Sequence, residues 1–312
     1  MPDQSLSIVP QELLILGAAV KTGMIDALYR RPMSVEELTA EIDADGRAVR
    51  VVVDALEALA YVEREGAKVR LTEEAANKFY NREANNYMGF SFMHRYNIIN
   101  SWIHLPEVIR SGQPHPREED PESLKFFMAS MGHNSRESAP VVADFILEGN
   151  GEGLEILDVG RGPLTYARVF ASLGARVTIL DLPEVVDYMS TFLTGTEGIV
   201  MVPGDFNLAL PPGPFNLVYL GNVCHIFGEH ENRELFKKAA DVLSPDGRIA
   251  IVDFIRGTSP MAAVFGVNML VNTKSGGTWT LAQYSTWLGD AGFCNVTFQE
   301  VGGRQLLLAQ KK

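Results

Sequence analysis

The sequence predicts an α/β protein with a mostly parallel sheet, preceded by a mainly helical N-terminal part. An apolar strand from Leu154 runs into a glycine turn, a helix and a second strand that ends at Asp181. Two further buried strands follow at about 200–203 and 215–220, and a helix covers 231–243. This alternation of strands and helices is typical of a parallel sheet with helices on its faces. The 312 residues, 46% of them apolar, allow two domains with separate cores.

The first hundred residues are predicted to form helices and one small hairpin. Ser34 and Glu37 form a capping box before one helix, and Gly46 separates this helix from another that reaches Ala60. Residues 61–71 alternate around Gly66, as the strands of a β-hairpin do. This pattern resembles a winged helix, which raises the question of DNA binding.

The charge distribution argues against nucleic acid as a partner. Residues 1–80 carry 9 Lys plus Arg against 14 Asp plus Glu, and the whole chain has a formal net charge of -12. The helix that would enter a DNA groove has Arg47 and Arg50, balanced by Asp54 and Glu57. Nucleic acids and anionic lipids are bound by basic surfaces. We therefore expect neither a nucleic acid nor a membrane as partner.

The remaining composition favours a soluble, cytoplasmic protein without a metal. The apolar run that starts at Leu13 has about 8 residues, too few to span a bilayer, and Asp3 and Glu12 stand where a secretory signal would be basic. Two cysteines without paired spacing favour a reducing compartment. The six histidines form no ligand motif along the sequence, so no metal site is expected.

The turn after the first predicted strand favours an adenosine-containing cofactor. Gly160 and Gly162 allow backbone amides to approach a ligand at the start of a helix. Asp181, at the end of the next strand, can accept hydrogen bonds from both ribose hydroxyls. A dinucleotide fingerprint would need a third glycine where the chain has Thr165. The carboxylate of Asp158 would repel a pyrophosphate and attract the ammonium and sulfonium groups of S-adenosylmethionine.

Taken alone, this turn leaves a methyl donor, a dinucleotide and a purely structural role open. The third strand ends in Gly204-Asp205-Phe206, which offers a carboxylate for the adenine amine and an aromatic face for its ring. His225 follows the fourth strand at its carboxyl end, where open α/β sheets place ligands. These residues together favour a purine cofactor.

The chain resembles the bacterial members of the S-adenosylmethionine-dependent small-molecule O-methyltransferase family, related to the plant caffeate and flavonoid O-methyltransferases. The matching stretches, in family order, are DVGRGPLTYA, ILDLPEVV, GDF, NVCHIFGEHEN, LSPDGRIAIVDF, NMLVNT and WLGDAGF. The resemblance implies a Rossmann-like class I methyltransferase domain at 151–312, with a mostly parallel seven-stranded sheet. It also implies a winged-helix-like dimerisation domain at 1–100, a helical connector that roofs the substrate pocket at 101–150, and a homodimer.

The resemblance carries a set of site residues with it. It implies contacts to S-adenosyl-L-methionine, and to the product S-adenosyl-L-homocysteine, from Gly160, Asp181, Asp205 and Phe206, with Asp158, Gly162 and Asn222 as further candidates. It implies His225 as the catalytic base. Asp253 stands where the plant members carry a glutamate beside that base.

The chemistry of a sulfonium methyl group explains why a base is needed. The methyl is already activated, so the enzyme has to align an acceptor oxygen and remove its proton. An imidazole with its ordinary pKa of about 6.5 suits this task, provided its other ring nitrogen has a partner that fixes the tautomer. Asp253 is our candidate for that partner of His225. The alternatives are that Asp253 only caps a strand predicted at 248–255, and that His225 is an ordinary core histidine.

A small acceptor, aromatic or polyketide-like, is the expected substrate. Residues 85–147 are rich in bulky apolar side chains that could roof its pocket, although plain helix packing explains them as well. The candidate pocket residues are Trp102, Phe127, Met131, Phe265, Asn268 and Met269.

Three residues depart from the family pattern. Arg161 and Leu164 stand in the glycine turn where most members have glycine, and Trp279 stands where plant members place a second glutamate against the base. These departures keep open a non-catalytic or altered-activity protein that retains the cofactor fold for binding or regulation. An NAD-dependent oxidoreductase is a further, less favoured alternative.

Overall fold

The computed structural model describes residues 9–116, 121–160, 162–193 and 196–312. The chain divides into two compact units, each with its own core. The first unit comprises the residues up to Asn97 together with Lys125–Ser130, and the second comprises Ile98–Leu124 and Met131–Lys312. Two helices therefore contribute to both units: α6 (Phe92–Ile103) and α8 (Ser123–Ser135).

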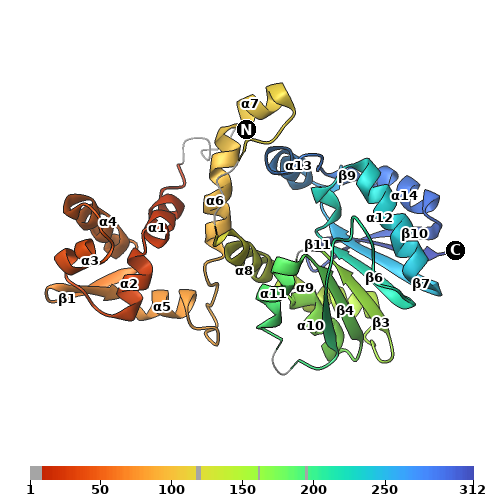
Figure 1. Ribbon diagram of the computed structural model, residues 1–312, viewed down its shortest axis with the longest axis horizontal. Coiled ribbons are helices and arrows are strands. Elements are labelled where there is room, and N and C mark those ends of the chain that lie inside the picture. The colour runs from red at the N-terminus through yellow and green to blue at the C-terminus, as the bar shows by residue number, and fades with distance from the viewer. Residues whose placement is uncertain (1–8, 117–120, 161, 194–195) are drawn as a thin grey trace. The chain divides into compact units, whose positions relative to one another are not determined.

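The first unit consists of short helices and one hairpin (Figure 1). Its elements, besides parts of α6 and α8, are α1 (Gln11–Lys21), α2 (Met24–Arg30), α3 (Val35–Glu41), α4 (Gly46–Ala58), β1 (Val62–Glu65), β2 (Lys68–Leu71) and α5 (Glu73–Phe79). The predicted capping box is present, because the Ser34 hydroxyl accepts the Glu37 N–H at 3.1 Å and the Glu37 carboxylate accepts the Ser34 N–H at 2.7 Å. The predicted hairpin is also present, with Val62 opposite Leu71.

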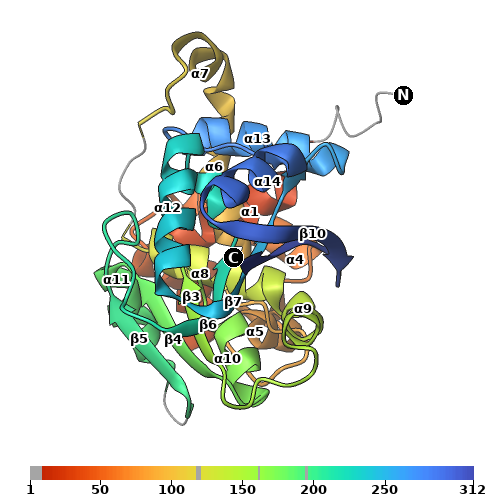
Figure 2. The same cartoon turned by 90° about the vertical axis from the view of Figure 1, so that its right-hand side faces the viewer.

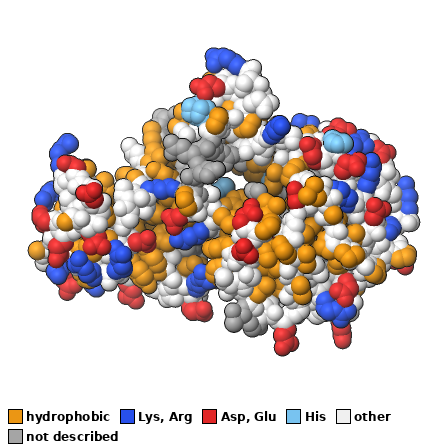
Figure 3. All heavy atoms as spheres, viewed as in Figure 1, with side chains coloured by type: hydrophobic (Ala, Val, Ile, Leu, Met, Phe, Trp, Pro, Cys, Tyr) orange, Lys and Arg blue, Asp and Glu red, His pale blue; other side chains and the backbone are white. Residues whose placement is uncertain are grey.

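Several arginines of this unit are paired with acids. Arg50 of α4 lies 3.2 Å from Glu36, and Arg64 donates to Glu57 at 2.8 Å. On the face drawn in Figure 3, basic side chains lie among acidic ones over these helices. The described surface of α4 thus has the balanced charge that the sequence predicts.

The second unit contains the seven-stranded sheet that the resemblance implies, in the order β10-β11-β7-β6-β3-β4-β5. The five strands from β7 to β5 are parallel, and β11 is antiparallel to both of its neighbours. The strands are β3 (Glu155–Val159), β4 (Arg176–Asp181), β5 (Ile199–Pro203), β6 (Phe215–Gly221), β7 (Leu243–Asp253), β10 (Phe293–Val301) and β11 (Arg304–Lys311). This is the mixed α/β architecture predicted from the sequence.

Helices cover both faces of this sheet (Figures 1 and 2). One face is covered by α9 (Ser138–Leu147), α10 (Thr165–Ser172) and α11 (Pro183–Ser190), and the other by α12 (Glu229–Val242) and α14 (Leu281–Asp290). The remaining elements are α7 (Leu105–Ser111), the short helix η2 (Cys224–Ile226), β8 (Ile255–Arg256), α13 (Pro260–Asn272) and β9 (Trp279–Thr280). Within the described residues, no helix is both long enough and apolar enough to cross a membrane.

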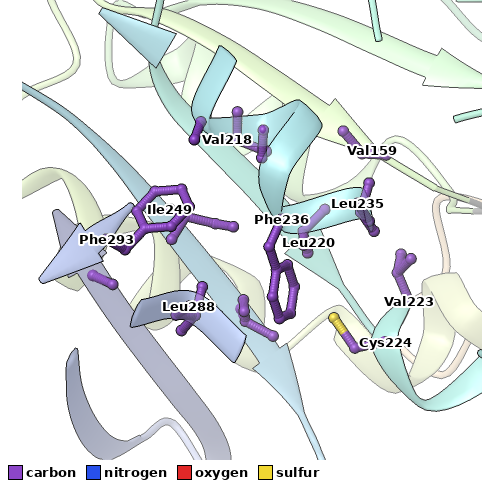
Figure 4. Close-up of a cluster of buried hydrophobic side chains, with 14 of the residues drawn as sticks. Val159, Val218, Leu220, Val223, Cys224, Leu235, Phe236, Ile249, Leu288 and Phe293 are labelled. Atoms are coloured by element: carbon purple, nitrogen blue, oxygen red, sulfur yellow. The ribbon is translucent and has the colours of Figure 1, made fainter. Parts of the chain in front are cut away.

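The core beneath α12 and α14 explains the apolar character of the central strands. Val218 and Leu220 of β6 and Ile249 of β7 pack against Phe236 of α12 and Leu288 of α14 (Figure 4). A parallel sheet that is buried on both faces needs such nearly continuous apolar strands.

Some predicted boundaries differ from the structure: the helix predicted to reach Ala60 ends at Ala58, and the helix predicted at 231–243 spans Glu229–Val242. The strand predicted at 248–255 begins earlier, at Leu243, and ends at Asp253. Leu243 pairs with Phe215 of β6, and after an irregularity in the register the pairing resumes with Arg248 opposite Leu217.

Candidate active site

The carboxyl ends of five neighbouring parallel strands form one edge of the sheet. Asp181 at the end of β4 lies opposite Pro203 at the end of β5, and Gly221 of β6 lies opposite Val252 of β7. Because the strand ends are aligned, residues that follow different strands meet at the same edge. The candidate cofactor residues and the candidate catalytic residues all lie on or just after these five strands.

The glycine turn after β3 requires glycine at its first position. Gly160 has a φ of +117°, and a Cβ there would lie 2.3 Å from Cγ2 of Val223. The Gly162 N–H donates to Oδ2 of Asp181 at 3.1 Å, and the Leu182 N–H donates to Oδ1 at 2.8 Å. The turn is therefore held against the end of β4. Arg161 lies outside the described residues.

Three acids give this part of the edge its chemical character. Asp158 and Asp181 lie on adjacent strands, and Asp205 follows the next strand. Burial and the neighbouring charge of Asp181 raise the pKa of Asp158 to about 7. Asp205 accepts hydrogen bonds from the backbone and side chain of Asn207 at 2.8 and 2.9 Å. Carboxylates at these three positions suit the hydroxyl and cationic groups of S-adenosylmethionine and would repel a pyrophosphate.

The structure adds contacts for two of the candidate cofactor residues, Phe206 and Asn222, and shows the environment of Leu164. The Phe206 ring is 7% exposed and packs edge-on against Phe227, with the ring centres 5.3 Å apart. Asn222 has a φ of +59° and accepts a hydrogen bond from Arg304 at 2.7 Å. Leu164 is buried, at the N-cap of α10. Arg304 had no signal in the sequence, because only the antiparallel insertion of β11 brings it to this edge.

His225 and Asp253 form a buried pair at the same edge. Oδ1 of Asp253 lies 2.6 Å from Nδ1 of His225, and Oδ2 accepts the backbone N–H of His225 at 3.0 Å. Oδ1 also accepts the Phe254 N–H at 2.7 Å, and Oδ2 accepts the Tyr284 hydroxyl at 3.4 Å. A carboxylate in this position fixes the tautomer of the imidazole, with Nδ1 as the donor.

Two aromatic rings lie close to the imidazole. The Phe265 ring stands edge-on to His225 at 4.9 Å between ring centres, and Phe254 stacks on Phe265 at 3.9 Å. Among the described residues, none forms a hydrogen bond with Nε2 of His225. This nitrogen therefore keeps its lone pair available to accept a proton.

The backbone around His225 is held from two directions. The Trp279 indole N–H donates to the Cys224 carbonyl at 3.1 Å, and the Gly277 N–H donates to the His225 carbonyl at 2.9 Å. A Cβ on Gly276 would lie 2.4 Å from that same His225 carbonyl oxygen. The side-chain amide of Asn232 donates to the Cys224 carbonyl at 2.9 Å. Trp279 thus cannot act as a second acid beside His225, but its hydrogen bond holds the backbone next to the base in place.

The buried thiol beside this pair is poorly suited to act as a nucleophile. Burial, together with the charge of Asp253, raises the pKa of Cys224 well above its ordinary value. A thiol held in its protonated form is a weak nucleophile. The thiol is therefore a poor alternative to the imidazole as the reactive group beside Asp253.

The six predicted acceptor residues do not fall in one unit. Trp102 of α6 donates through its indole N–H to Oδ1 of Asn268 at 3.1 Å, and Asn268 shares α13 with Phe265 and the buried Met269. Met131 belongs to the same unit, whereas Phe127 belongs to the first unit, where its ring packs edge-on against His94 at 5.2 Å.

The strand order, with helices on both faces of the sheet, is that of a class I S-adenosylmethionine-dependent methyltransferase. Residues 102–294 match the family model of the O-methyltransferase domain, so the chain belongs to the O-methyltransferase family. S-adenosylmethionine is its cofactor, and the enzyme interpretation is favoured over a non-catalytic protein.

Individual relatives extend over nearly the whole chain. The chain is 25% identical to the tetracenomycin polyketide synthesis 8-O-methyl transferase TcmO of Streptomyces glaucescens, over 95% of this chain and 91% of the relative. It is 24% identical to the 3-hydroxy-5-methyl-1-naphthoate 3-O-methyltransferase of Streptomyces sahachiroi, over 90% and 86%. The fold is similar to that of PigF with SAH, with a TM-score of 0.78, 20% identity and 96% of each chain covered. PigF is a methyl transferase of Serratia sp. (strain ATCC 39006).

Proposed function

We propose that this protein transfers a methyl group from S-adenosylmethionine to a hydroxyl of a small aromatic or polyketide-like acceptor, with His225 as general base. The observation that carries the proposal is the buried His225-Asp253 pair at 2.6 Å, whose ring stands against Phe265 at the carboxyl edge of the sheet. The name of one Streptomyces relative specifies polyketide synthesis and that of the other a naphthoate, which supports an acceptor of this kind.

The roles of the residues follow from their positions. Bound S-adenosylmethionine supplies a methyl group that is already activated. Asp181 would accept the ribose hydroxyls, and Asp158 would attract the positive groups of the methionine part. Asp205, after the next strand, would accept the adenine amine, with Gly160 allowing the ligand to approach the backbone.

The base acts on the acceptor. Asp253 holds Nδ1 of His225 as a donor, so Nε2 is left to receive the proton of the acceptor hydroxyl as the oxygen attacks the methyl carbon. Phe265 and Phe254 offer flat apolar faces to an aromatic ring beside that nitrogen. Trp102 and Asn268 would form a polar wall of the same pocket.

Calorimetry with S-adenosylmethionine and S-adenosylhomocysteine, followed by a transfer assay with hydroxylated naphthoates and anthraquinones, tests this function. We expect both cofactor forms to bind with one site per chain. His225→Ala should keep this binding and lose transfer by about 10²–10⁴-fold. Absence of binding would refute the enzyme, and unchanged turnover in His225→Ala would refute the base.

Partly exposed apolar side chains on the first unit support a role in dimerisation. Leu13 and Leu14 of α1 are only partly buried, and Val51 of α4 is 59% exposed. We infer that residues 1–100 form a winged-helix-like domain that dimerises through such surfaces, and that residues 101–150 roof the acceptor pocket of 151–312. Light scattering should give twice the mass of one chain, and a monomer at micromolar concentration would contradict this assignment.

A cytoplasmic location completes the proposal. Both cysteines are free thiols in the structure, as expected in a reducing compartment. Cell fractionation of the native host tests the location directly.

A further inference from the structure

We propose that His104, Glu107 and His115 bind a divalent transition metal ion of the zinc type. The proposed site lies at α7 in the second unit and has no part in the methyl-transfer chemistry described above. The sequence spacing of the histidines did not indicate this site, because His104 and His115 lie at opposite ends of α7 along the chain.

The three side chains already converge. Nδ1 of His104 lies 2.8 Å from Oε2 of Glu107, and Nδ1 of His115 lies 3.6 Å from the same oxygen. One ligand atom from each of the three residues lies within 4.8 Å of the others. The two imidazole rings stack at 3.5 Å between centres with planes 6° apart, so the rings have to tilt toward each other before both Nδ1 lone pairs can bind one ion.

The local chain path explains this convergence. His104 is the N-cap of α7, and Glu107 lies in its first turn. A helix of seven residues is about 10 Å long, and three residues of extended chain cover about the same distance. Gly112 ends α7 in the left-handed conformation, with a φ of +68°. The chain can therefore return along the helix and bring His115 back to His104.

The turn that reverses the chain is itself fixed. The Ser111 hydroxyl donates to the Gln113 carbonyl at 3.2 Å and accepts the Gln113 N–H at 3.1 Å. Pro114 and Pro116 flank His115 and restrict its backbone. The backbone that carries His115 is therefore restrained before an ion binds.

Two imidazoles and one carboxylate are a ligand set that Zn²⁺ takes in proteins, with the fourth position open to water. In the ion-free protein, the contact between His104 and Glu107 is a hydrogen bond of 2.8 Å. A metal ion would replace the proton in it. His115 is 36% exposed and Glu107 is 62% exposed, so an ion can reach the site from solvent.

The position of the site gives the ion a structural consequence. His104 lies two residues after Trp102, whose indole is bound to Asn268, and α7 contacts α13. An ion that joins the two ends of α7 would hold this wall of the acceptor pocket in one conformation. We therefore expect bound metal to stabilise the second unit against unfolding.

Titration of the tag-free, metal-stripped protein with Co²⁺, followed by displacement with Zn²⁺, tests the site. Co²⁺ bound by nitrogen and oxygen ligands absorbs in the visible range, which gives a readout independent of methyl transfer. We expect one ion per chain. His115→Ala and Glu107→Gln should each weaken binding at least about tenfold, while the matched control His230→Ala, an exposed histidine of α12, should bind as wild type.

The results divide cleanly. Saturation at one ion per chain, lost in His115→Ala and Glu107→Gln and kept in His230→Ala, supports the site. Zn²⁺ should then raise the melting temperature of the wild type and of His230→Ala, but not that of His115→Ala or Glu107→Gln. Unsaturable binding, or equal affinity in all variants, would show adventitious binding and overturn the proposal. Because His115 lies in an exposed loop, folding of its variant is checked by an unchanged melt without metal.

Discussion

Asp253 contacts His225 through both of its carboxylate oxygens, one at the imidazole Nδ1 (2.6 Å) and one at the backbone N–H (3.0 Å). The first contact fixes the tautomer of the ring, and the second fixes the position of the residue that carries it. Since both partners are buried, water cannot substitute for either contact. One acid therefore orients the base and also holds the segment in which it lies.

Asp253→Asn should abolish most transfer while keeping the cofactor bound. An amide of the same size has only one acceptor oxygen. Its NH₂ group would therefore face a donor, either Nδ1–H or the backbone N–H of His225, and one of the two contacts would be lost. We expect kcat to fall by about 10²–10⁴-fold. Asp246→Asn, an exposed site at the start of β7, is the matched control and should keep full activity. A changed KM with an unchanged kcat would contradict an orienting role.

Trp279→Phe and Trp102→Phe should separate catalysis from acceptor binding. Each replacement removes one indole hydrogen bond, from the Cys224 carbonyl and from Asn268 respectively. Trp279→Phe loosens the segment that carries His225, so we expect a lower kcat and about 1 kcal/mol less stability. Trp102→Phe should raise the KM for the acceptor and leave kcat close to wild type. Steady-state kinetics of both variants measures kcat and the KM for the acceptor. If kcat and KM change in the same way in both variants, these assignments are wrong.

Gly276→Ala should damage both stability and activity. The new methyl group would lie 2.4 Å from the His225 carbonyl oxygen and 2.7 Å from that of Ile226, so backbone would have to move. We expect a loss of about 1–3 kcal/mol and a lower kcat. Gly289→Ala in α14 meets no atom within 4 Å and should be neutral or slightly stabilising. Chemical denaturation measures the free energy of unfolding of both variants. An equal loss of stability in the two would contradict the prediction.

Asp158 should make the stability of the cofactor-free protein depend on pH. Its pKa rises from 3.8 to about 7 on folding, because of burial and the charge of Asp181. Between these values the folded protein keeps a proton that the unfolded chain has lost. The stabilisation is therefore complete below pH 4 and decreases as pH rises to 7, by at most about 1.4 kcal/mol per pH unit.

Asp158→Asn should remove this dependence. Urea unfolding between pH 4 and 8 measures it, with Asp246→Asn expected to follow the wild-type curve. If Asp158→Asn also follows the wild-type curve, the titration belongs to another group.

The local patterns of the chain sufficed for much of the fold. The strand, glycine turn and helix from Leu154 onward appear as β3, Gly160 and α10, and the capping box at Ser34 is formed as predicted. These features depend on contacts within a few residues, such as turn conformation and helix capping. The family, the cofactor and the seven-stranded sheet were likewise predictable from short motifs in order.

Contacts between distant residues were decided by the tertiary structure. Only the pairing of β6 with β7 brings His225 to Asp253, 28 residues later, and only the antiparallel β11 brings Arg304 to Asn222. The family pattern placed Trp279 near the base but gave no sign of its bond to the Cys224 carbonyl, and the convergence of His104 and His115 had no sequence signal. Sequence by itself determined which elements form, because local backbone preferences and apolar patterning act over short distances. Which side chains meet was decided by strand order and chain reversal, because these depend on how whole elements pack.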